Sequence, residues 1–240
     1  MKIKFNNIVL DDRLEKYTTV NVEGRGLFAP TIKIIDIEGS DGDFIESQKY
    51  SSREIKVYFI IKAKNNSEKL EAIEELNLLI QSEDEVAFSF DDEKGYRLGR
   101  LKSVENIRYD YFTGQGNFTI YCKKPWKYLE NKKLGGNDIT INYSEKHSRL
   151  EYVDFTFTNT SDEFEIKNIT NGDVIKVNNL DGLRGKVIIN NNSITINGKV
   201  ISNKLDYTIS TWKNFRIKNG DNIVITGGNT PEVIYRGVIL

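Results

Sequence analysis

The first half of the chain shows the alternation of apolar and polar residues that is typical of β-strands. Residues 2–5 alternate strictly, residues 31–37 carry four isoleucines, and residues 54–63 form a β-branched and aromatic run bounded by polar residues. Strand-like segments resume later, at residues 86–90, 96–102 and 116–121. This half is therefore expected to be built mainly from β-sheet.

One stretch in this half changes period and predicts a helix. Between residues 66 and 81, glutamates and lysines fill one side, and Asn66 or Ser67 can cap the start. The apolar positions at helical spacing are Leu70, Ile73, Leu76, Leu79 and Ile80. We expect this single amphipathic helix to pack on the sheet.

Beyond residue 137 the pattern changes to short β-branched runs separated by Asn, Asp and Gly. Their spacing is that of an all-β sandwich. Residues 194–201 are the clearest example, because Asn197 and Gly198 accept the positive φ angles of a type I′ hairpin turn. The second half is therefore expected to be a β-sandwich.

A polar stretch separates the two halves. Residues 130–137 contain two lysines followed by Gly135 and Gly136, which favours a flexible linker. A boundary here gives an N-terminal module at residues 1–129 and a C-terminal module at residues 130–240, neither of them large. The predicted fold class is mainly β, with an α+β first module of sheets packed with one helix and a sandwich as the second module.

The composition narrows the class of protein. Of the 240 residues, 38% are hydrophobic and 29% are charged, enough to build cores and to cover a soluble surface. The 34 basic and 35 acidic residues leave a net charge of -1, which disfavours general binding to nucleic acid. No apolar stretch approaches the roughly 18 to 20 residues of a membrane span, and the polar start predicts no signal peptide. We expect a chain that folds in a cytoplasm and has no membrane partner.

Residues able to carry metal or redox chemistry are scarce. A single Cys122 cannot form an intrachain disulfide, and a single His147 cannot complete a tetrahedral Cys/His zinc site. His147 lies in a polar stretch and is interpreted as a surface residue, and the acidic runs at residues 41–43 and 91–93 are interpreted as turns. No catalytic, cofactor or metal site is expected. A polysaccharide-cleaving enzyme would need two carboxylates close together in a groove, and the sequence order indicates no such pair.

Two aromatic groups could serve recognition or packing. In the second half, Tyr207, Trp212 and Tyr235 could form a sugar-stacking platform, although burial in a sandwich core is the interpretation that we favour. Trp126 lies within the lysine-rich residues 123–127, which could form a patch for polyanions. An aromatic tucked between two modules is the simpler interpretation of Trp126. Neither group establishes a function by itself.

A series of motifs runs through the first 128 residues in a fixed order. Val-Glu-Gly-Arg-Gly-Leu-Phe-Ala-Pro at residues 22–30 is followed by Gly-Ser-Asp-Gly-Asp-Phe at 39–44, Arg-Glu-Ile-Lys-Val at 53–57, and further motifs at 88–93, 96–101 and 116–128. This order resembles the distal tail (Dit) family of long-tailed, siphovirus-type phages. Residues 194–200, 205–206 and 215–223 are similar to the galectin-like module of that family.

The resemblance implies a structural protein of the phage tail tip, a distal tail protein or baseplate hub, and not an enzyme. In such a protein the N-terminal module forms a homo-hexameric ring around the tail channel, and the C-terminal galectin-like β-sandwich projects outward. The ring would join the tail tube protein to the tail-tip lysin or fibre hub, and the outer module could hold receptor-binding proteins for host adsorption. DNA would meet the ring only while passing through its channel. The protein would reside in the virion, at the tail tip, after synthesis in the bacterial host cytoplasm.

One apolar loop and the sheet edges offer a route to ring closure. Leu27, Phe28 and Pro30 lie in a loop too apolar to favour water, so they are the candidate ring interface. Unpaired strand edges could be completed by the next subunit in a head-to-tail contact that closes. The alternative function is a carbohydrate-binding module that contacts the host cell wall through the three aromatic residues of the second half.

Overall fold

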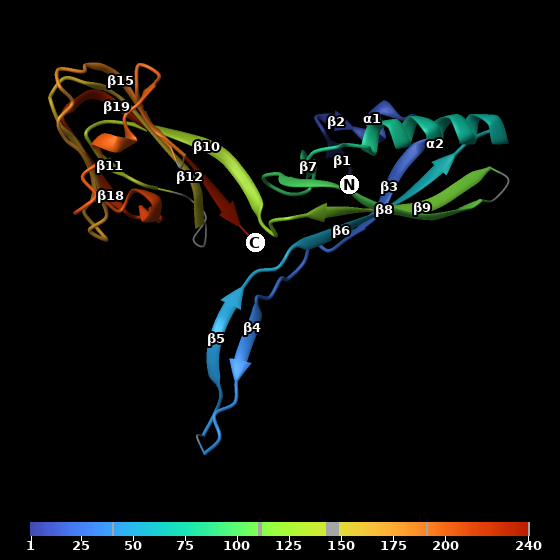
Figure 1. The fold of residues 1–240 in the computed structure, drawn as a ribbon. Coiled ribbons are helices and arrows are strands. Elements are labelled where there is room, and N and C mark those ends of the chain that lie inside the picture. The colour runs from blue at the N-terminus through green and yellow to red at the C-terminus, as the bar shows by residue number, and fades with distance from the viewer. Residues whose placement is uncertain (40, 110–111, 143–148, 191, 240) are drawn as a thin grey trace. The chain divides into compact units, whose positions relative to one another are not determined.

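The computed structural model describes residues 1–39, 41–109, 112–142, 149–190 and 192–239, and it is built mainly from β-strands. The chain divides into two compact units, residues 1–127 and residues 128–239, each with its own hydrophobic core (Figure 1). Among the described residues, no helix is long and apolar enough to span a membrane. The predicted fold class, mainly β with one longer helix in the first half, is confirmed.

The first unit is organised around a seven-stranded antiparallel sheet with the strand order β2-β1-β7-β8-β9-β6-β3. Its strands are β1 (Ile3–Phe5), β2 (Ile8–Val9), β3 (Tyr17–Glu23), β6 (Arg53–Lys62), β7 (Val86–Phe90), β8 (Arg97–Tyr109) and β9 (Thr113–Cys122). A one-turn helix α1 (Leu10–Arg13) follows β2, and the longer helix α2 (Asn66–Ile80) connects β6 to β7. Apart from residues 31–37, every strand predicted in the first half belongs to this sheet.

Strands β6 and β9 show why this sheet forms. In β6, Ile55, Val57 and Phe59 are buried, while the residues between them are exposed or half-buried. Phe118 and Ile120 of β9 oppose this strand and are fully buried. Because side chains alternate between the faces of a strand, the two strands together present one apolar face to the core.

Helix α2 packs on the same core by a narrow stripe. Its buried residues are Lys69, Ala72, Leu76 and Ile80. The prediction that Leu70 faces the core is wrong, because this residue lies about 100° around the helix from Lys69 and is 45% exposed. The cap also differs from the prediction. Asn65 is the capping residue, and its side chain accepts a hydrogen bond of 2.9 Å from the backbone N–H of Glu68.

A separate two-stranded hairpin interrupts the first unit between β3 and β6. Its strands β4 (Thr31–Ile35) and β5 (Phe44–Lys49) pair antiparallel with each other and, within the described residues, with no other strand. Every residue of both strands is exposed. Figure 1 shows the hairpin standing clear of the seven-stranded sheet. The predicted isoleucine-rich strand therefore exists, but it contributes nothing to the core.

The second unit is a sandwich of two antiparallel sheets, with the strand orders β10-β19-β12-β15-β16-β17 and β11-β18-β13-β14. Its strands are β10 (Lys127–Gly135), β11 (Asp138–Thr140), β12 (Arg149–Asn159), β13 (Phe164–Asn168), β14 (Val174–Val177), β15 (Gly185–Ile189), β16 (Ile194–Ile196), β17 (Lys199–Val200), β18 (Asn222–Thr226) and β19 (Gly228–Ile239). Two one-turn 3₁₀ helices, η1 (Ser202–Lys204) and η2 (Trp212–Asn214), precede β18. Both sheets contribute to one core, in which the rings of Phe157 and Phe164 have their centroids 5.0 Å apart.

The hairpin predicted at residues 194–201 is present as β16 and β17. Asn197 and Gly198 form its turn, with φ angles of 49° and 81°. Positive φ at both turn residues matches the twist of the flanking strands. The turn chemistry of this pair therefore predicted the local structure correctly.

The stretch predicted to be a flexible linker is largely a strand. Residues 130–135 belong to β10, which pairs with β19 at the edge of the six-stranded sheet. The N–H of Gly136 donates a hydrogen bond of 3.0 Å to the carbonyl of Pro231, which ties the end of this stretch to the sandwich. Lysines are common on edge strands because they discourage unwanted pairing, so the polar composition suits this position equally well.

Candidate interaction surface

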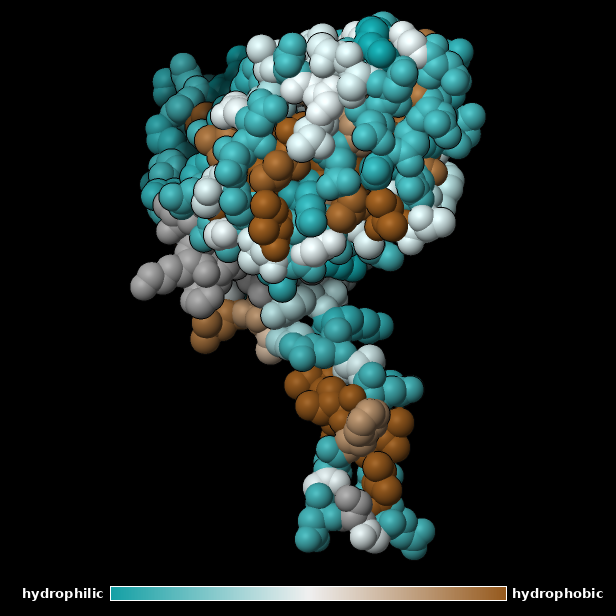
Figure 2. All heavy atoms as spheres, turned by 90° about the vertical axis from the view of Figure 1, so that its left-hand side faces the viewer, coloured by the Kyte–Doolittle hydropathy of each residue, from teal (hydrophilic) through white to brown (hydrophobic). Residues whose placement is uncertain are grey.

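The β4–β5 hairpin gathers six exposed large apolar side chains in one short segment of the first unit. Ile34 opposes Ile45 and Ile35 opposes Phe44 in its register, so apolar side chains are paired on both of its faces. The exposed fractions are Ile32 49%, Ile34 57%, Ile35 42%, Ile37 49%, Phe44 57% and Ile45 57%. Figure 2 shows these hydrophobic side chains clustered along the projecting arm. A contiguous apolar patch of this kind marks an interaction site, because a monomer gains nothing by exposing it to water.

The base of the hairpin is held by an aromatic and cationic cluster. The Phe28 ring lies between the guanidinium of Arg53, 4.4 Å from the ring centroid, and the ring of Tyr50, whose centroid is 6.3 Å away. Nη2 of Arg53 also donates a hydrogen bond of 3.1 Å to the carbonyl of Gly26. These contacts fix the loop that leads into the hairpin, and they leave Leu27 completely exposed beside it.

The three residues predicted as a ring interface thus have different surroundings. Leu27 faces solvent, whereas Phe28 and Pro30 are half-buried, and the Phe28 ring is already engaged by Arg53. The larger apolar surface lies immediately after them, in the hairpin. One sequence signal could have indicated it: consecutive Ile34 and Ile35 place apolar side chains on opposite faces of a strand, which no single core can bury.

Ion pairs stabilise the end of the sheet from which the hairpin rises. Arg25 donates two hydrogen bonds to the carboxylate of Asp92, at 2.6 and 3.0 Å, and these hold the pKa of Asp92 below its usual range. The guanidinium of Arg25 also lies 4.8 Å from the centroid of the Phe90 ring. The chain is therefore held to the sheet before Gly24 by strand β3 and after it by Arg25. Gly24 itself has a φ of 86°, which favours glycine.

The outer face of the seven-stranded sheet is polar, in contrast to the hairpin. Lys56 of β6 pairs with Glu105 of β8 at 2.6 Å, and the same carboxylate accepts a hydrogen bond of 2.8 Å from Asn117 of β9. Lys102 pairs with Glu54 at 2.6 Å. Charged and amide groups linked across three strands are compatible with water. These charged pairs distinguish this part of the sheet from the apolar side chains of the hairpin.

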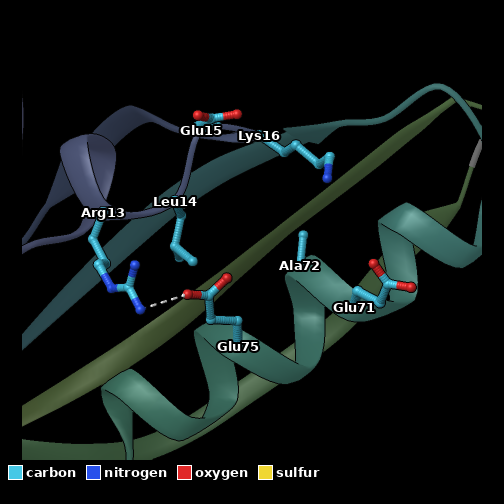
Figure 3. A pocket seen from close by; sticks show the side chains of 7 residues that line it. All are labelled: Arg13, Leu14, Glu15, Lys16, Glu71, Ala72 and Glu75. Atoms are coloured by element: carbon cyan, nitrogen blue, oxygen red, sulfur yellow. Dashed lines mark ion pairs between the residues drawn. The ribbon is translucent and has the colours of Figure 1, made fainter.

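A shallow hollow of about 270 Å³ lies between the segment after α1 and helix α2 (Figure 3). Its lining is largely charged, and Arg13 pairs across it with Glu75 at 3.3 Å. Glu71, one turn before Glu75, accepts a hydrogen bond from Ser67 of the same helix. The contacts of Glu71 and Glu75 hold local structure, one within α2 and one between α2 and α1.

The aromatic residues considered as a sugar platform do not share an exposed face. Tyr235 lies in β19 and is fully buried, as the favoured interpretation expects, so the alternative of an exposed platform loses this residue. Trp212 is half-buried against the core, and its Nε1 donates a hydrogen bond of 3.2 Å to the carbonyl of Asn190. Tyr207 alone is well exposed, at 69%.

The residues considered for metal or acid–base chemistry form no centre in the described part of the chain. No group of three or more His, Cys, Asp or Glu side chains there is placed to hold a metal ion. Cys122 is fully buried at the end of β9, and burial raises the pKa of its thiol to about 12. A protonated, inaccessible thiol is a packing residue. His147 lies outside the described residues.

Two family models match the chain, one in each unit. The phage tail protein RIFT-related domain matches residues 13–122, and the siphovirus-type tail component, C-terminal domain, matches residues 149–237. The chain belongs to the siphovirus distal tail protein family. The predicted resemblance is thereby confirmed, and a distal tail protein is a structural component of the phage tail.

Solved structures of phage proteins share the fold of this distal tail protein. The crystal structure of the SPP1 Dit protein superimposes with a TM-score of 0.79 at 18% identity, covering 100% of this chain and 99% of that one. A chain of the phage P2 baseplate, in its activated conformation with Ca, gives a TM-score of 0.55 at 12% identity over 98% and 96% of the two chains. The same baseplate with Sr gives 0.53 at 13% identity, over 98% and 96%. No curated protein matches the chain in sequence.

Proposed function

We propose that this distal tail protein forms a ring of six copies that joins the tail tube to the tail-tip and host-adsorption apparatus. The observation that carries the proposal is the β4–β5 hairpin, whose every strand residue is exposed and whose isoleucines pair with apolar partners. The SPP1 Dit protein, which has the same fold, is described as a paradigm of the hub adsorption apparatus of phages that infect Gram-positive bacteria. A hub role without catalysis is consistent with both observations.

The hairpin supports assembly because its apolar side chains remain unburied within one chain. Each large apolar side chain moved from water into an interface contributes about 1.5–3 kcal/mol when it is buried completely. Six such residues are 42–57% exposed here, so a partner that covers them gains a substantial part of this free energy. An isolated two-stranded hairpin is marginal in water, and the same cover would stabilise it.

A ring needs a contact between two different surfaces of the same chain, repeated until it closes. In such a contact the hairpin of one copy meets a surface of the next copy other than its hairpin. The resemblance to the family suggests the number six. It also suggests that the tail tube protein docks on one ring face and the tail-tip lysin or fibre hub on the other. DNA would pass through the channel without a dedicated binding site.

We place the second unit outside the ring, as a galectin-like sandwich that serves as a platform for receptor-binding proteins. Its exposed apolar residues are few and separate, including Val200 at 60% and Ile209 at 48%. The buried Tyr235 and half-buried Trp212 support a docking role over direct sugar binding. Titration of the protein with host wall polysaccharide checks this assignment, and saturable quenching of tryptophan fluorescence that is lost in Trp212→Ala would favour the carbohydrate-binding alternative.

Mass measurement by light scattering tests the ring. Six copies of the 27.6 kDa chain amount to about 166 kDa, and this species is expected with or without tail tube protein. Replacing the opposed pair Ile34 and Ile45 by serine should remove it and leave a folded monomer. The matched control is Val200→Ser with Ile209→Ser, which removes apolar surface of similar exposure from the second unit and should leave the ring intact.

The outcomes separate clearly. A wild-type protein that remains monomeric at high concentration, even with tail tube protein present, would rule out the ring. Equal loss of assembly in the control variant would show that nonspecific hydrophobic association, and not the hairpin, drives assembly. Negative-stain images of the 166 kDa species would then report its symmetry directly.

A further inference from the structure

Arg53 is a buried cation whose side chain is bonded only in part. The residue is 3% exposed, and its Nη2 donates a hydrogen bond of 3.1 Å to the carbonyl of Gly26. Its Nε and Nη1 have no hydrogen-bond partner among the described residues. Charged N–H donors of this kind form their strongest hydrogen bonds with carboxylate oxygens. Two of the three guanidinium nitrogens therefore lack an acceptor within the described part of the chain.

The carboxylate that lies near Arg53 already serves other cations. Glu93 accepts hydrogen bonds from the buried Arg97 and lies 3.2 Å from the Nζ of Lys127. Burial, and after it the charge of Arg97, lowers the pKa of Arg53, and the attraction of Glu93 is a smaller contribution in the opposite direction. Glu93 therefore compensates its two bonded cations and leaves the charge of Arg53 largely uncompensated.

A buried guanidinium without an anion opposes folding of the single chain. Buried charges are normally paired with opposite charges, because taking an ion out of water is costly. The ring of Phe28, whose centroid is 4.4 Å from the guanidinium carbon, offsets part of this cost. Arg53 also occupies the buried face of β6, in the same alternation as Ile55 and Val57, where an apolar residue would fit. Its charge is therefore better explained by an anion that it binds than by packing.

The groups that cover Arg53 belong to a surface loop. Gly26, which accepts the bond from Nη2, is exposed, and Leu27 beside it is completely exposed. Phe28 is half-buried, with the guanidinium on its ring and the ring of Tyr50 stacked 6.3 Å from it, centroid to centroid. Displacement of this one half-buried ring would give a carboxylate from outside access to the guanidinium.

The surroundings of Arg53 continue the apolar surface of the hairpin. Strand β5 ends at Lys49 and β6 begins at Arg53, so the guanidinium lies at the base of the hairpin. Leu27 and Tyr50 add exposed apolar area beside it. Arginine and tyrosine in a contact that excludes water are among the side chains that contribute most to protein interfaces. A second copy that covers the hairpin is therefore placed to cover Arg53 as well.

We infer that Arg53 receives a carboxylate of the next copy of this chain when the ring forms. The inference rests on the proposed ring function and names the chemical group that the contact supplies. In the single chain the guanidinium is buried without an anion, whereas in the ring a carboxylate accepts hydrogen bonds from its unsatisfied nitrogens. The guanidinium is already out of water, so the attraction is stronger than between exposed charges. Arg53 thus lowers the stability of the single chain and raises that of the ring.

Two buried arginines allow a matched test in the full-length protein. Arg53→Met removes a charge that has no carboxylate, so the urea midpoint of the dilute monomer should stay the same or rise. The carbonyl of Gly26 can then bond to water, because Gly26 is exposed. Arg97→Met is the control, since it takes away the buried cation that Glu93 binds, and its urea midpoint should fall.

Light scattering over a range of protein concentrations measures assembly of the same variants. Arg53→Met should need at least about tenfold more protein than the wild type to form the ring. Arg53→Lys keeps the charge without the planar guanidinium and should recover part of the assembly. A gain or no change in monomer stability together with a loss of assembly is a combination that a merely structural role would not produce.

Cross-linking of Arg53→Lys identifies the carboxylate. A water-soluble carbodiimide joins a lysine amine to an adjacent carboxylate as an amide, with loss of water that the reagent takes up, and it does not couple arginine. Mass spectrometry of the assembled variant should find a cross-link from position 53 to an aspartate or glutamate of another copy. The same treatment of the dilute monomer should leave position 53 unlinked.

The outcomes distinguish this contact from the ring itself. If the wild type forms rings and Arg53→Met assembles at the same concentration, the inference is wrong while the ring stands. It is equally wrong if Arg53→Met lowers the monomer midpoint as much as Arg97→Met does, or if position 53 is cross-linked in the dilute monomer, because the carboxylate would then lie in the same copy. A wild type that forms no ring contradicts the proposed function.

Discussion

Two isoleucine-rich hairpins of this chain have opposite surroundings. In β16–β17 of the second unit, Ile194 and Ile196 are 0% and 2% exposed. In β4–β5 of the first unit, Ile34 and Ile45 are both 57% exposed. Isoleucines in the same type of local structure are thus buried in a core in the second unit and exposed to solvent in the first. The comparison shows that residues which favour a strand do not by themselves determine whether the side chains of that strand are buried.

The arrangement of residues accounts for the difference. In β16, Thr195 stands between the two isoleucines, so both side chains point to one face, where the four-stranded sheet completes the core. In β4, Ile34 and Ile35 are consecutive and point to opposite faces, and among the described strands no second sheet covers either of them. Burial inside the chain supports folding, whereas exposure in the hairpin leaves the same free energy available for assembly.

The largest effect on stability is expected in the β16–β17 hairpin, whose isoleucines are buried. Ile194→Ala removes a fully buried side chain and leaves a cavity between the sheets of the sandwich. The free energy of unfolding of the second unit should fall by about 2–5 kcal/mol. Urea unfolding followed by Trp212 fluorescence, in a background where Trp126 is replaced by Phe, reports this unit. A loss below about 1 kcal/mol would mean that the sandwich core repacks and that the contrast between the hairpins is smaller than their exposure suggests.

A second prediction concerns the anchor of the exposed hairpin. Gly24 has a φ of 86°, and a Cβ there would lie 2.1 Å from the carbonyl oxygen of Glu54, so Gly24→Ala must displace backbone. We expect a loss on the order of 2–4 kcal/mol from the first unit. Gly42 at the hairpin tip has a φ of 88° but open space around it, so Gly42→Ala is the control and should cost no more than about 1 kcal/mol. Equal losses of stability in the two variants, measured by thermal or urea unfolding, would show that the close approach of Gly24 to the Glu54 carbonyl does not stabilise the first unit.

Periodicity in the sequence predicted most of the fold, because it reports local structure. The alternation around Val57 and the Asn197-Gly198 turn both correspond to the observed strands. The pattern could not predict what lies opposite a strand. Residues 130–135 look like a linker because lysines there are polar, yet an edge strand accepts them. For Tyr235 the apolar neighbours in its strand did favour burial, and the core of the sandwich buries its ring.

The candidate surface was predicted in part for the same reason. The apolar loop drew attention to Leu27, which is indeed exposed, but the hairpin that follows was predicted only as a strand. Whether an isoleucine is buried depends on elements that are distant in sequence. The local periodicity of the sequence also does not indicate whether a partner molecule covers an exposed side chain. The acidic run at residues 41–43 was interpreted as a turn, and it lies in the connection between β4 and β5.

A third prediction tests whether solvent is excluded from Cys122, at the end of the sheet where the β4–β5 hairpin begins. The buried thiol of Cys122 has its pKa raised from 9.0 to about 12, so the native state holds the proton more tightly than the unfolded chain. This contribution to stability is complete below pH 9 and is lost as pH rises from 9 towards 12. At pH 10 the loss is about 1.4 kcal/mol. Cys122→Ala should therefore show a shallower decline between pH 8 and pH 10 than the wild type. Parallel declines, or rapid reaction of the native thiol with a disulfide reagent at pH 8, would contradict the closed environment.

The smallest effect on folding is expected in the hairpin itself, and this result completes the comparison with Ile194. Ile34 is 57% exposed and its strand belongs to no core, so Ile34→Ala leaves no cavity and removes little surface that folding buries. The free energy of unfolding, measured by urea at a concentration dilute enough to keep the protein monomeric, should change by less than about 0.5 kcal/mol. The same substitution measured at concentrations that favour assembly should reduce the stability of the assembled form, because only there is Ile34 covered. If Ile34→Ala instead destabilised the dilute monomer as strongly as Ile194→Ala destabilises the sandwich, the hairpin would have to be packed within its own chain in solution. Its apolar side chains would then no longer be available to a neighbouring copy.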